Sequence, residues 1–249
     1  MGKAASGRIA YVPCNPANHG GRRGKSAIKY LVYHYTGNDG DNGANNAAYY
    51  RDNVVRASAH YFVDDDSVTQ SVDDLTVAWA VGGQKWSDCA KTGGGKLYGV
   101  VTNTNSLSIE MCDTRRDGTY NVTEATMENA LALGRMLMER YGIPIERVIR
   151  HFDVTGKHCP AYFMDEDKWA AFKARLNEEE DEDMKRYNTM AEISQEAPWA
   201  VETVEKLIQG GAIRGNGAPP DKDGNPTDMD LSRDMLRDFV TNDRMGLYR

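Results

Sequence analysis

The 249-residue sequence has little of what several protein classes require. It contains only four cysteines, Cys14, Cys89, Cys112 and Cys159, which lie far apart and form no C-x-x-C pair. This is too sparse for a disulfide-stabilised fold, so we expect free thiols, one of which could be a metal ligand. No run of about 18 apolar residues exists, so a membrane span is not expected.

The sequence also lacks an apolar stretch at its N-terminus. Residues 1–26 have no hydrophobic core of the kind that a secretory signal needs, so we expect synthesis and initial residence in the cytoplasm. Basic residues are not in excess, and the formal net charge is −7. This charge argues against a general nucleic-acid binder, because phosphate affinity depends on clustered Lys and Arg.

What is present is the composition of an ordinary globular protein, with 40% hydrophobic and 27% charged residues. The length suits one large domain, or a medium domain with a small appendage. Within 177–188 a run of acidic residues interrupts the apolar patterning, which is typical of a solvated helix end or linker. We therefore expect a first domain over 1–178 and a second over 188–249.

Four segments of the first domain have strand-like patterns. Residues 28–37 are rich in aromatic and β-branched side chains, and 59–72 predict two short strands around an acidic turn. Residues 147–152 predict another short strand. Residues 107–112 alternate with period two, which puts Leu107, Ile109 and Met111 on one face and Ser108, Glu110 and Cys112 on the other.

A long amphipathic helix is predicted after Thr123, a suitable N-cap. Apolar or small side chains recur there at three- and four-residue spacing until Gly142 and Pro144 end the pattern. Another helix is predicted over 167–176. Together these segments predict an α/β fold with a central mixed β-sheet flanked by α-helices.

The second domain is predicted to be small and all-helical. Pro198 suits a first helical turn, Gly210 and Gly211 end its apolar stripe, and Ser232 is a suitable N-cap for a last helix. Two short helices bury little surface alone. We therefore expect this domain to pack on the first domain or on a partner, including a second copy of the chain.

Histidine is scarce, with five in the chain. Two of them, His151 and His158, lie in the stretch RHFDVTGKHCP (150–160) together with Cys159. Taken alone, this stretch has three interpretations: part of a metal site, a thiol nucleophile with its base, or a loop around a buried cysteine. Catalytic zinc takes three protein ligands and a water, so His151 and Cys159 would need His34, at the end of the first strand, as a third ligand.

The simpler interpretations of other polar residues stay open at this level. Glu110 could be a solvated residue on the polar face of a strand, and Lys157 an exposed loop lysine. His60 could be a core histidine with its hydrogen bonds satisfied. Trp79 and Trp86 could belong to the core or line a sugar-binding groove.

Four motifs in this order resemble one known family. They are YHYTG (33–37), ASAHYFVDDD (57–66), SIEMC (108–112) and RHFDVTGKHCP (150–160). Together they resemble the zinc-dependent N-acetylmuramoyl-L-alanine amidases, the type-2 amidase family of phage lysins, autolysins and peptidoglycan recognition proteins. The resemblance implies hydrolysis of peptidoglycan at the amide bond between the lactyl group of N-acetylmuramic acid and the L-alanine of the stem peptide.

The resemblance also implies roles for individual residues. By position, His34, His151 and Cys159 would be the ligands of Zn²⁺. Glu110 would be the general base, and Lys157 would be the cation near the scissile carbonyl. Some relatives carry a tyrosine where this chain has Ser58 or Ala59. Without it, proton handling falls on Glu110, with His60 considered as an assistant.

Three competing hypotheses accompany the amidase one. They are a peptidoglycan-binding protein without activity, a cysteine hydrolase that uses Cys159 with His151 or His158, and a structural wall-associated protein. Many recognition-only relatives lack the ligand thiol, so Cys159 favours an enzyme.

The tail has a looser resemblance, to a single S-layer homology unit, carried by PWAVETVEKLIQGGAIRG (198–215) and LSRDMLRDF (231–239). Such units usually occur in threes and bind cell-wall polymers, so wall binding and formation of a homodimer are both considered for this domain. Because no secretory signal is encoded, we expect a phage or prophage lysin that reaches the wall after release from the cell, or else an extracellular enzyme.

Overall fold

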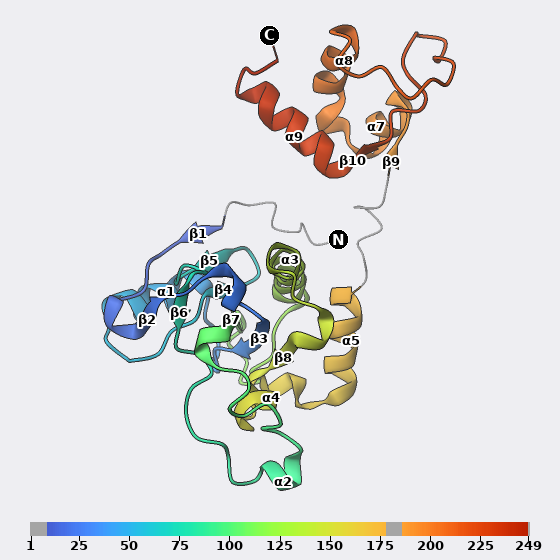
Figure 1. Ribbon diagram of the computed structural model, residues 1–249. Coiled ribbons are helices and arrows are strands. Elements are labelled where there is room, and N and C mark those ends of the chain that lie inside the picture. The colour runs from blue at the N-terminus through green and yellow to red at the C-terminus, as the bar shows by residue number, and fades with distance from the viewer. Residues whose placement is uncertain (1–8, 178–185, 249) are drawn as a thin grey trace. The chain divides into compact units, whose positions relative to one another are not determined.

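The computed structural model describes residues 9–177 and 186–248 (Figure 1). Contacts divide the chain into two compact units, with the division after Asn177. Most of the predicted boundary segment, 177–188, lies outside the described residues. The assignment of a catalytic domain to 1–178 and of a helical domain to 188–249 stays a prediction, and each unit is described here by itself.

A six-stranded mixed sheet forms the centre of the first unit, in the order β1-β5-β4-β7-β3-β8. Its neighbouring strands are parallel except for the antiparallel pair β4 and β5. The strands are β1 (Ala10–Tyr11), β3 (Tyr30–Tyr35), β4 (Tyr61–Val63), β5 (Val68–Gln70), β7 (Ser106–Met111) and β8 (Val148–Arg150). A separate antiparallel pair joins β2 (His19–Arg22) to β6 (Thr76–Ala78). The predicted α/β class is confirmed.

One face of this sheet is apolar and is covered by α3 (Glu124–Tyr141) and α5 (Glu166–Asn177) (Figure 1). The main hydrophobic core joins both helices to alternate strand residues, including Leu31, Tyr33, Leu107, Ile109 and Met111. The period-two pattern of β7 therefore points its apolar side chains as the sequence predicts. Ser108 and Glu110 face the other way.

Helix α3 begins and ends where the sequence predicts. The Thr123 hydroxyl accepts a hydrogen bond from the Thr126 amide at 3.1 Å, and Gly142 ends the helix in the left-handed region, with φ of 62°. In the middle of the helix, Gly134 lies against the Tyr33 hydroxyl, which donates to the Ala130 carbonyl at 3.0 Å. This contact holds β3 against α3.

The opposite face of the sheet packs against α1 (Gly43–Asp52), which no sequence pattern indicated. Ala47 of α1 contacts Ala59, Phe62 and Cys112 in a small buried cluster. Asn42 caps the helix by accepting from the Asn45 amide at 2.8 Å. The helix therefore borders the polar face that carries Glu110.

The predicted strand over 147–152 is too long. β8 ends at Arg150, and His151 begins the short helix α4 (His151–Thr155). The reason is a local cap, because the Asp153 carboxylate accepts from the Arg150 amide at 2.8 Å and draws the chain into a turn. Other short helices of this unit are α2 (Cys89–Thr92) and 3-10 turns at Pro16–Asn18, Lys25–Ala27, Asn103–Asn105, Ile145–Arg147 and Ala161–Met164.

The second unit is mainly helical. Its helices within residues 186–248 are α7 (Met190–Glu196), α8 (Val201–Gln209), which follows a 3-10 turn at Pro198–Ala200, and α9 (Arg233–Arg244). The last two match the predicted helices, and Ser232 caps α9 as expected. α7, with its own capping box between Thr189 and Glu192, was not predicted. A two-residue antiparallel pair, β9 (Arg186–Tyr187) with β10 (Leu231–Ser232), also departs from the all-helical expectation.

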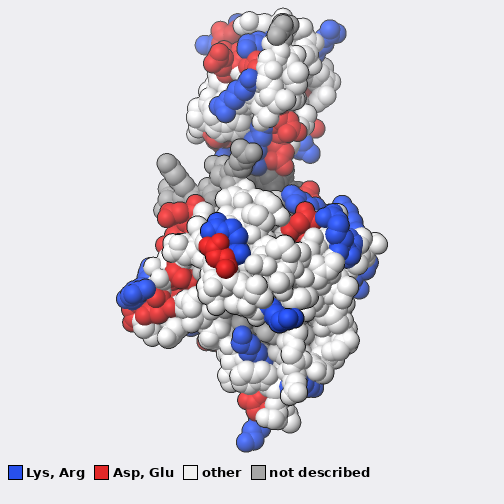
Figure 2. Space-filling model, turned by 90° about the vertical axis from the view of Figure 1, so that its left-hand side faces the viewer, with Lys and Arg blue, Asp and Glu red and all other residues white. Residues whose placement is uncertain are grey.

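Charged side chains are dispersed over the surface that Figure 2 shows. Acidic and basic groups lie there in small clusters separated by uncharged areas, without a continuous basic surface on this face. Such a surface is what binding to a polyanion requires. Among the described residues, no helix combines the length and apolarity needed to cross a bilayer.

Candidate metal centre and active site

His34 and Glu110 are brought together by the pairing of two central strands. Parallel pairing of β3 with β7 sets His34 beside Glu110 in register. Because their neighbours Tyr33 and Ile109 point into the apolar core, both polar side chains project from the opposite face. His34 Nδ1 lies 3.9 Å from Glu110 Oε1.

His151 directly follows β8, the strand on the other side of β3. β8 pairs with β3 so that Arg150 lies beside Tyr33, and His151 follows directly. The Arg150 guanidinium is fixed by Asp153 at 2.8 Å and by Glu166 at 3.0 Å, which anchors the turn. As a result, the rings of His34 and His151 lie 4.7 Å apart, centroid to centroid.

Cys159 returns to the same place through the loop after α4. The Phe152 amide donates to the Cys159 carbonyl at 3.0 Å, which draws the end of the loop back to its beginning. Gly156 ends α4 in the left-handed region with φ of 85°, and a side chain there would overlap Cys89. The Cys159 sulfur thereby lies 3.8 Å from His34 Nδ1.

The three side chains form a buried cluster whose potential ligand atoms all lie within 4.8 Å of one another. Both ring nitrogens of His151 and Nε2 of His34 are enclosed without a hydrogen-bond partner in the described chain. Buried polar atoms are seldom left so unless an ion or water completes them. Two imidazoles and a thiol in this arrangement fit a zinc site with one position left for water.

Burial sets the ionisation of these groups. It lowers the pKa of His34 well below its usual value, and the positive fields of His151 and Lys157 add to the effect. Burial, reinforced by Lys157, lowers the pKa of His151 to about 4. Both rings are therefore neutral near pH 7, the form that binds metals.

The Cys159 thiol is 1% exposed, and burial with the nearby Glu110 charge raises its pKa to about 12. A nucleophilic cysteine needs access and a lowered pKa. These properties disfavour the cysteine hydrolase hypothesis, whereas a metal ion would stabilise the thiolate.

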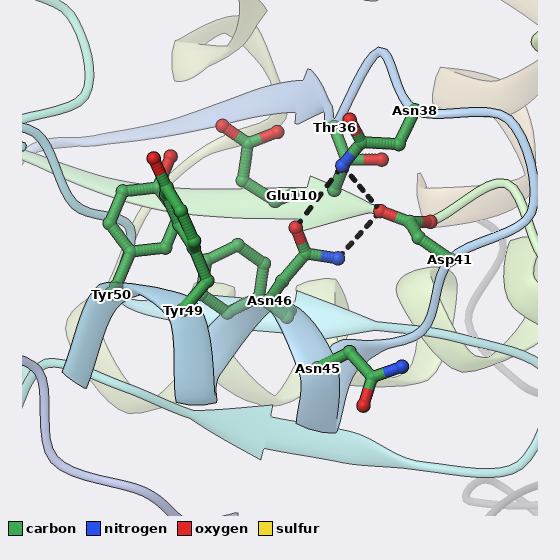
Figure 3. A pocket seen from close by; sticks show the side chains of 9 residues that line it. Thr36, Asn38, Asp41, Asn45, Asn46, Tyr49, Tyr50 and Glu110 are labelled. Atoms are coloured by element: carbon green, nitrogen blue, oxygen red, sulfur yellow. Dashed lines mark hydrogen bonds between the residues drawn. The ribbon is translucent and has the colours of Figure 1, made fainter. Parts of the chain in front are cut away.

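Glu110 opens into a cavity of about 420 Å³, here named the α1 pocket (Figure 3). Its walls include Asn38, Asp41, Asn46, Tyr49, Tyr50 and Glu110. Burial raises the pKa of Glu110 to about 8, with the Lys157 cation opposing and Asp41 reinforcing the shift. A carboxyl with a pKa near neutrality can both accept and return a proton.

A second cavity, of about 610 Å³, lies against His151 and is here named the tryptophan pocket. Its walls include Arg56, Trp79, Trp86, Asn103, His151 and Lys157. Lys157 is exposed and makes no ion pair within the described part of the chain. Both tryptophans thus border the pocket that holds the predicted oxyanion partner, instead of packing in the core.

Some predicted residues lie outside the cluster. Both ring nitrogens of His60 are engaged in hydrogen bonds, Nδ1 with the Ser108 hydroxyl and Nε2 with the Thr76 carbonyl and Arg23, which leaves it no free group for an assisting role. His158 stacks on Trp86 with centroids 6.0 Å apart and is half exposed.

Ser58, at a position where some relatives carry tyrosine, has a local structural role. Its hydroxyl accepts from the Trp79 amide at 3.0 Å, and its amide donates to the Trp79 carbonyl at 3.1 Å. The residues of α1 were missed by the sequence analysis. The only signal was the concentration of Asn and Asp over 38–46, which by itself predicts a turn.

The fold and the cluster together define an α/β protein with a buried two-histidine, one-cysteine centre beside a carboxylate. The model of the family described as N-acetylmuramoyl-L-alanine amidase (Amidase_2) matches residues 24–162, more than half of the chain. The chain belongs to the N-acetylmuramoyl-L-alanine amidase family.

Individual relatives agree with this assignment. A "Probable N-acetylmuramoyl-L-alanine amidase" of Bacillus licheniformis is 32% identical over 157 residues, covering 61% of this chain and 42% of the relative. The amidase BlyA of Bacillus subtilis (strain 168) is 31% identical over 171 residues, covering 67% of this chain and 46% of the relative. This chain therefore spans less than half the length of both.

A solved structure, described as a mutant endolysin from Bacillus subtilis, superposes with a TM-score of 0.54 at 26% identity. The match covers 68% of this chain and 99% of that one. The segment that the family model matches, residues 24–162, includes His34, Glu110, His151 and Cys159.

Proposed function

We propose that this protein hydrolyses peptidoglycan at the amide bond between the lactyl group of N-acetylmuramic acid and the L-alanine of the stem peptide. The observation that carries the proposal is the buried cluster of His34, His151 and Cys159 beside Glu110, inside the region that matches the amidase family. Relatives named as amidases of this specificity support the choice of bond.

His34, His151 and Cys159 are proposed to hold Zn²⁺. Zinc in such a set acts as a Lewis acid that lowers the pKa of a bound water to about 7 and polarises a carbonyl. The two neutral imidazoles and the thiol suit this ion, since nitrogen and sulfur are its preferred donors.

Glu110 and Lys157 are proposed to act on the two sides of the scissile bond. Glu110 takes the proton of the attacking water and passes it to the departing L-alanine amine, and its pKa of about 8 suits both transfers. Lys157, free of ion pairs in the described chain, stabilises the negative charge that develops on the carbonyl oxygen.

We propose that the protein acts on the cell wall after it has been released from the cell. Similarity to a structure described as an endolysin supports a lysin. If instead the protein is found exported by an intact host cell, the lysin proposal fails and an autolysin remains. For the second unit, wall binding and formation of a homodimer remain proposals.

Digestion of purified cell walls tests the reaction. We expect new lactyl carboxyl groups and new L-alanine amino groups in equal amounts, loss of both with a chelator, and recovery with Zn²⁺. New reducing sugar ends in place of these groups would refute the amidase proposal. Activity that survives chelation but is lost on alkylation would favour the cysteine hydrolase, and binding without cleavage would favour a recognition protein.

A further inference from the structure

The two pockets that flank the metal cluster differ in charge. The α1 pocket is lined by the carboxylate of Asp41 and the buried carboxyl group of Glu110, and none of its lining residues is Lys, Arg or His. The tryptophan pocket has the cations Arg56 and Lys157 and no Asp or Glu in its lining. A substrate that spans the cluster therefore meets a negative field at one end and a positive field at the other.

Asp41 is held in the α1 pocket by neutral groups. Its Oδ2 accepts from Asn38 at 3.0 Å and from Asn46 at 2.6 Å (Figure 3). Its amide donates to the Asp113 carbonyl at 2.7 Å. Oδ1 has no hydrogen-bond partner, and Asp41 forms no ion pair with a described residue. The amide groups fix the carboxylate in place without neutralising it.

Arg116 does not supply the missing charge, since it donates to neither oxygen of Asp41. It packs against Gly40, next to Asp41 in the chain, but it is not part of the pocket lining. A fixed carboxylate of this kind favours a cationic ligand, because the amide groups already hold it in one orientation and no protein cation neutralises its charge.

The proposed reaction, on which this inference rests, decides which half of the substrate meets this charge. Glu110 delivers a proton to the departing amine and lines the α1 pocket, whereas Lys157 serves the carbonyl oxygen and lines the tryptophan pocket. The amine half of the substrate, which is the stem peptide, therefore extends into the α1 pocket. The acyl half, which carries the sugar, extends toward Trp79 and Trp86.

We propose that Asp41 determines specificity in the α1 pocket, by favouring stem peptides with a free side-chain ammonium group. Loss of the ammonium charge removes the attraction without changing the scissile bond. A sugar in the α1 pocket, stacked on Tyr49 or Tyr50, would make cleavage indifferent to that charge.

Two synthetic substrates test the proposal with the zinc-loaded full chain. They are N-acetylmuramoyl-L-alanyl-γ-D-glutamyl-L-lysine and the same compound acetylated on the lysine Nε. We expect kcat/KM to be about tenfold higher for the free ammonium form, the size of effect that one charge pair near a protein surface gives, and to lose part of this preference in high salt. Equal values for the two substrates would overturn the proposal.

Asp41→Asn should reduce the preference to less than about twofold, mainly through the free ammonium substrate. The matched control is Asp52→Asn, which removes an exposed carboxylate at the last residue of α1, outside the pocket, and should keep the tenfold preference. A preference that survives in Asp41→Asn overturns the role of Asp41. If that variant does not fold, equal values for the two substrates in the wild type would still overturn the proposal.

Calorimetric binding of the leaving peptide L-alanyl-γ-D-glutamyl-L-lysine, with and without Nε-acetylation, separates this inference from the reaction itself. Tighter binding of the free ammonium form to wild type, lost in Asp41→Asn, supports the subsite even if neither substrate is cleaved. In that case it is the proposed hydrolysis that fails. Equal or absent binding of the two peptides overturns the subsite.

Discussion

The two faces of the central sheet are built from the same strands, but one packs the apolar core and the other carries the candidate metal cluster. On β3, Tyr33 points into the apolar core under α3, and the next residue, His34, points into the candidate metal cluster. On β7, Ile109 likewise points into the apolar core, and Glu110 points to the side of the cluster. One face is filled with close-packed apolar side chains, and the other carries neutral histidines, a thiol and a carboxylate that lack protein partners for some of their buried atoms.

This comparison shows how the fold separates stability from chemistry. Alternation along a strand sends successive side chains to opposite faces, so a well-packed residue rigidly positions the reactive residue next to it. Substitutions on the two faces should then affect different measurements. Those on the polar face should change zinc content and turnover, and those on the apolar face should change the free energy of unfolding.

The largest expected effect comes from Cys159→Ala on the polar face. Loss of one of three ligands should remove zinc and lower the rate of wall hydrolysis on the order of a thousandfold or more. Zinc content by elemental analysis and release of L-alanine amino groups measure both. The matched control is Cys14→Ala, which removes another buried thiol, outside the cluster, and should keep zinc and activity. A zinc-loaded, active Cys159→Ala protein would contradict the ligand assignment.

Glu110→Gln should have the next largest effect. The substitution keeps the shape of the side chain and removes its ability to take a proton, so kcat should fall about a hundredfold to a thousandfold while zinc content stays unchanged. The melting temperature should not fall, because burial of this carboxyl already opposes its charged form. If the rate is unaffected, Glu110 is not the base; if zinc is lost as well, its role is structural.

Gly134→Ala tests the apolar face. A methyl group there would overlap the Tyr33 hydroxyl and Leu176, so α3 must shift or the hydrogen bond to Ala130 must break. Overpacking costs about 1–3 kcal/mol, partly offset by the roughly 1 kcal/mol gain in helix propensity. We expect a net destabilisation of about 1–2 kcal/mol in chemical unfolding, with kcat/KM within about twofold of wild type below the melting temperature.

Gly142→Ala is a suitable comparison for that variant, because Gly142 has open space around it but a positive φ. It should be destabilised through backbone strain alone. If Gly134→Ala instead leaves stability unchanged and reduces turnover, the two faces do not act separately, and strain in β3 reaches His34.

A structural element is predicted well from the sequence when the residues that determine its ends lie close to those ends in the chain. Both ends of α3 were predicted because Thr123 and Gly142 act on their immediate neighbours. The end of β8 was missed, since only the position of the Asp153 carboxylate over the Arg150 amide shows that the chain turns at His151. α1 was missed because its apolar side chains form no clear stripe.

The same distinction applies to the site. The residues of the cluster were inferred from motifs resembling a known family, and the structure brings the three candidate ligands together. The α1 pocket could not be predicted, since Asp41 and Asn46 belong to no motif and become neighbours of Glu110 only when α1 packs on the polar face. The proposed specificity pocket could therefore be found only from the tertiary structure.

The smallest expected effect is that of Tyr33→Phe. The variant removes only the hydroxyl that donates to the Ala130 carbonyl at 3.0 Å and leaves the buried ring against Phe172. A lost buried hydrogen bond should cost about 1 kcal/mol, which is a few degrees in melting temperature for a chain of this size. Turnover and zinc content should not change, and Tyr11→Phe, at an exposed position, should leave stability unchanged too. A tenfold loss of turnover without loss of stability would show that the position of His34 depends on this hydrogen bond. The two faces of β3 would then not act separately.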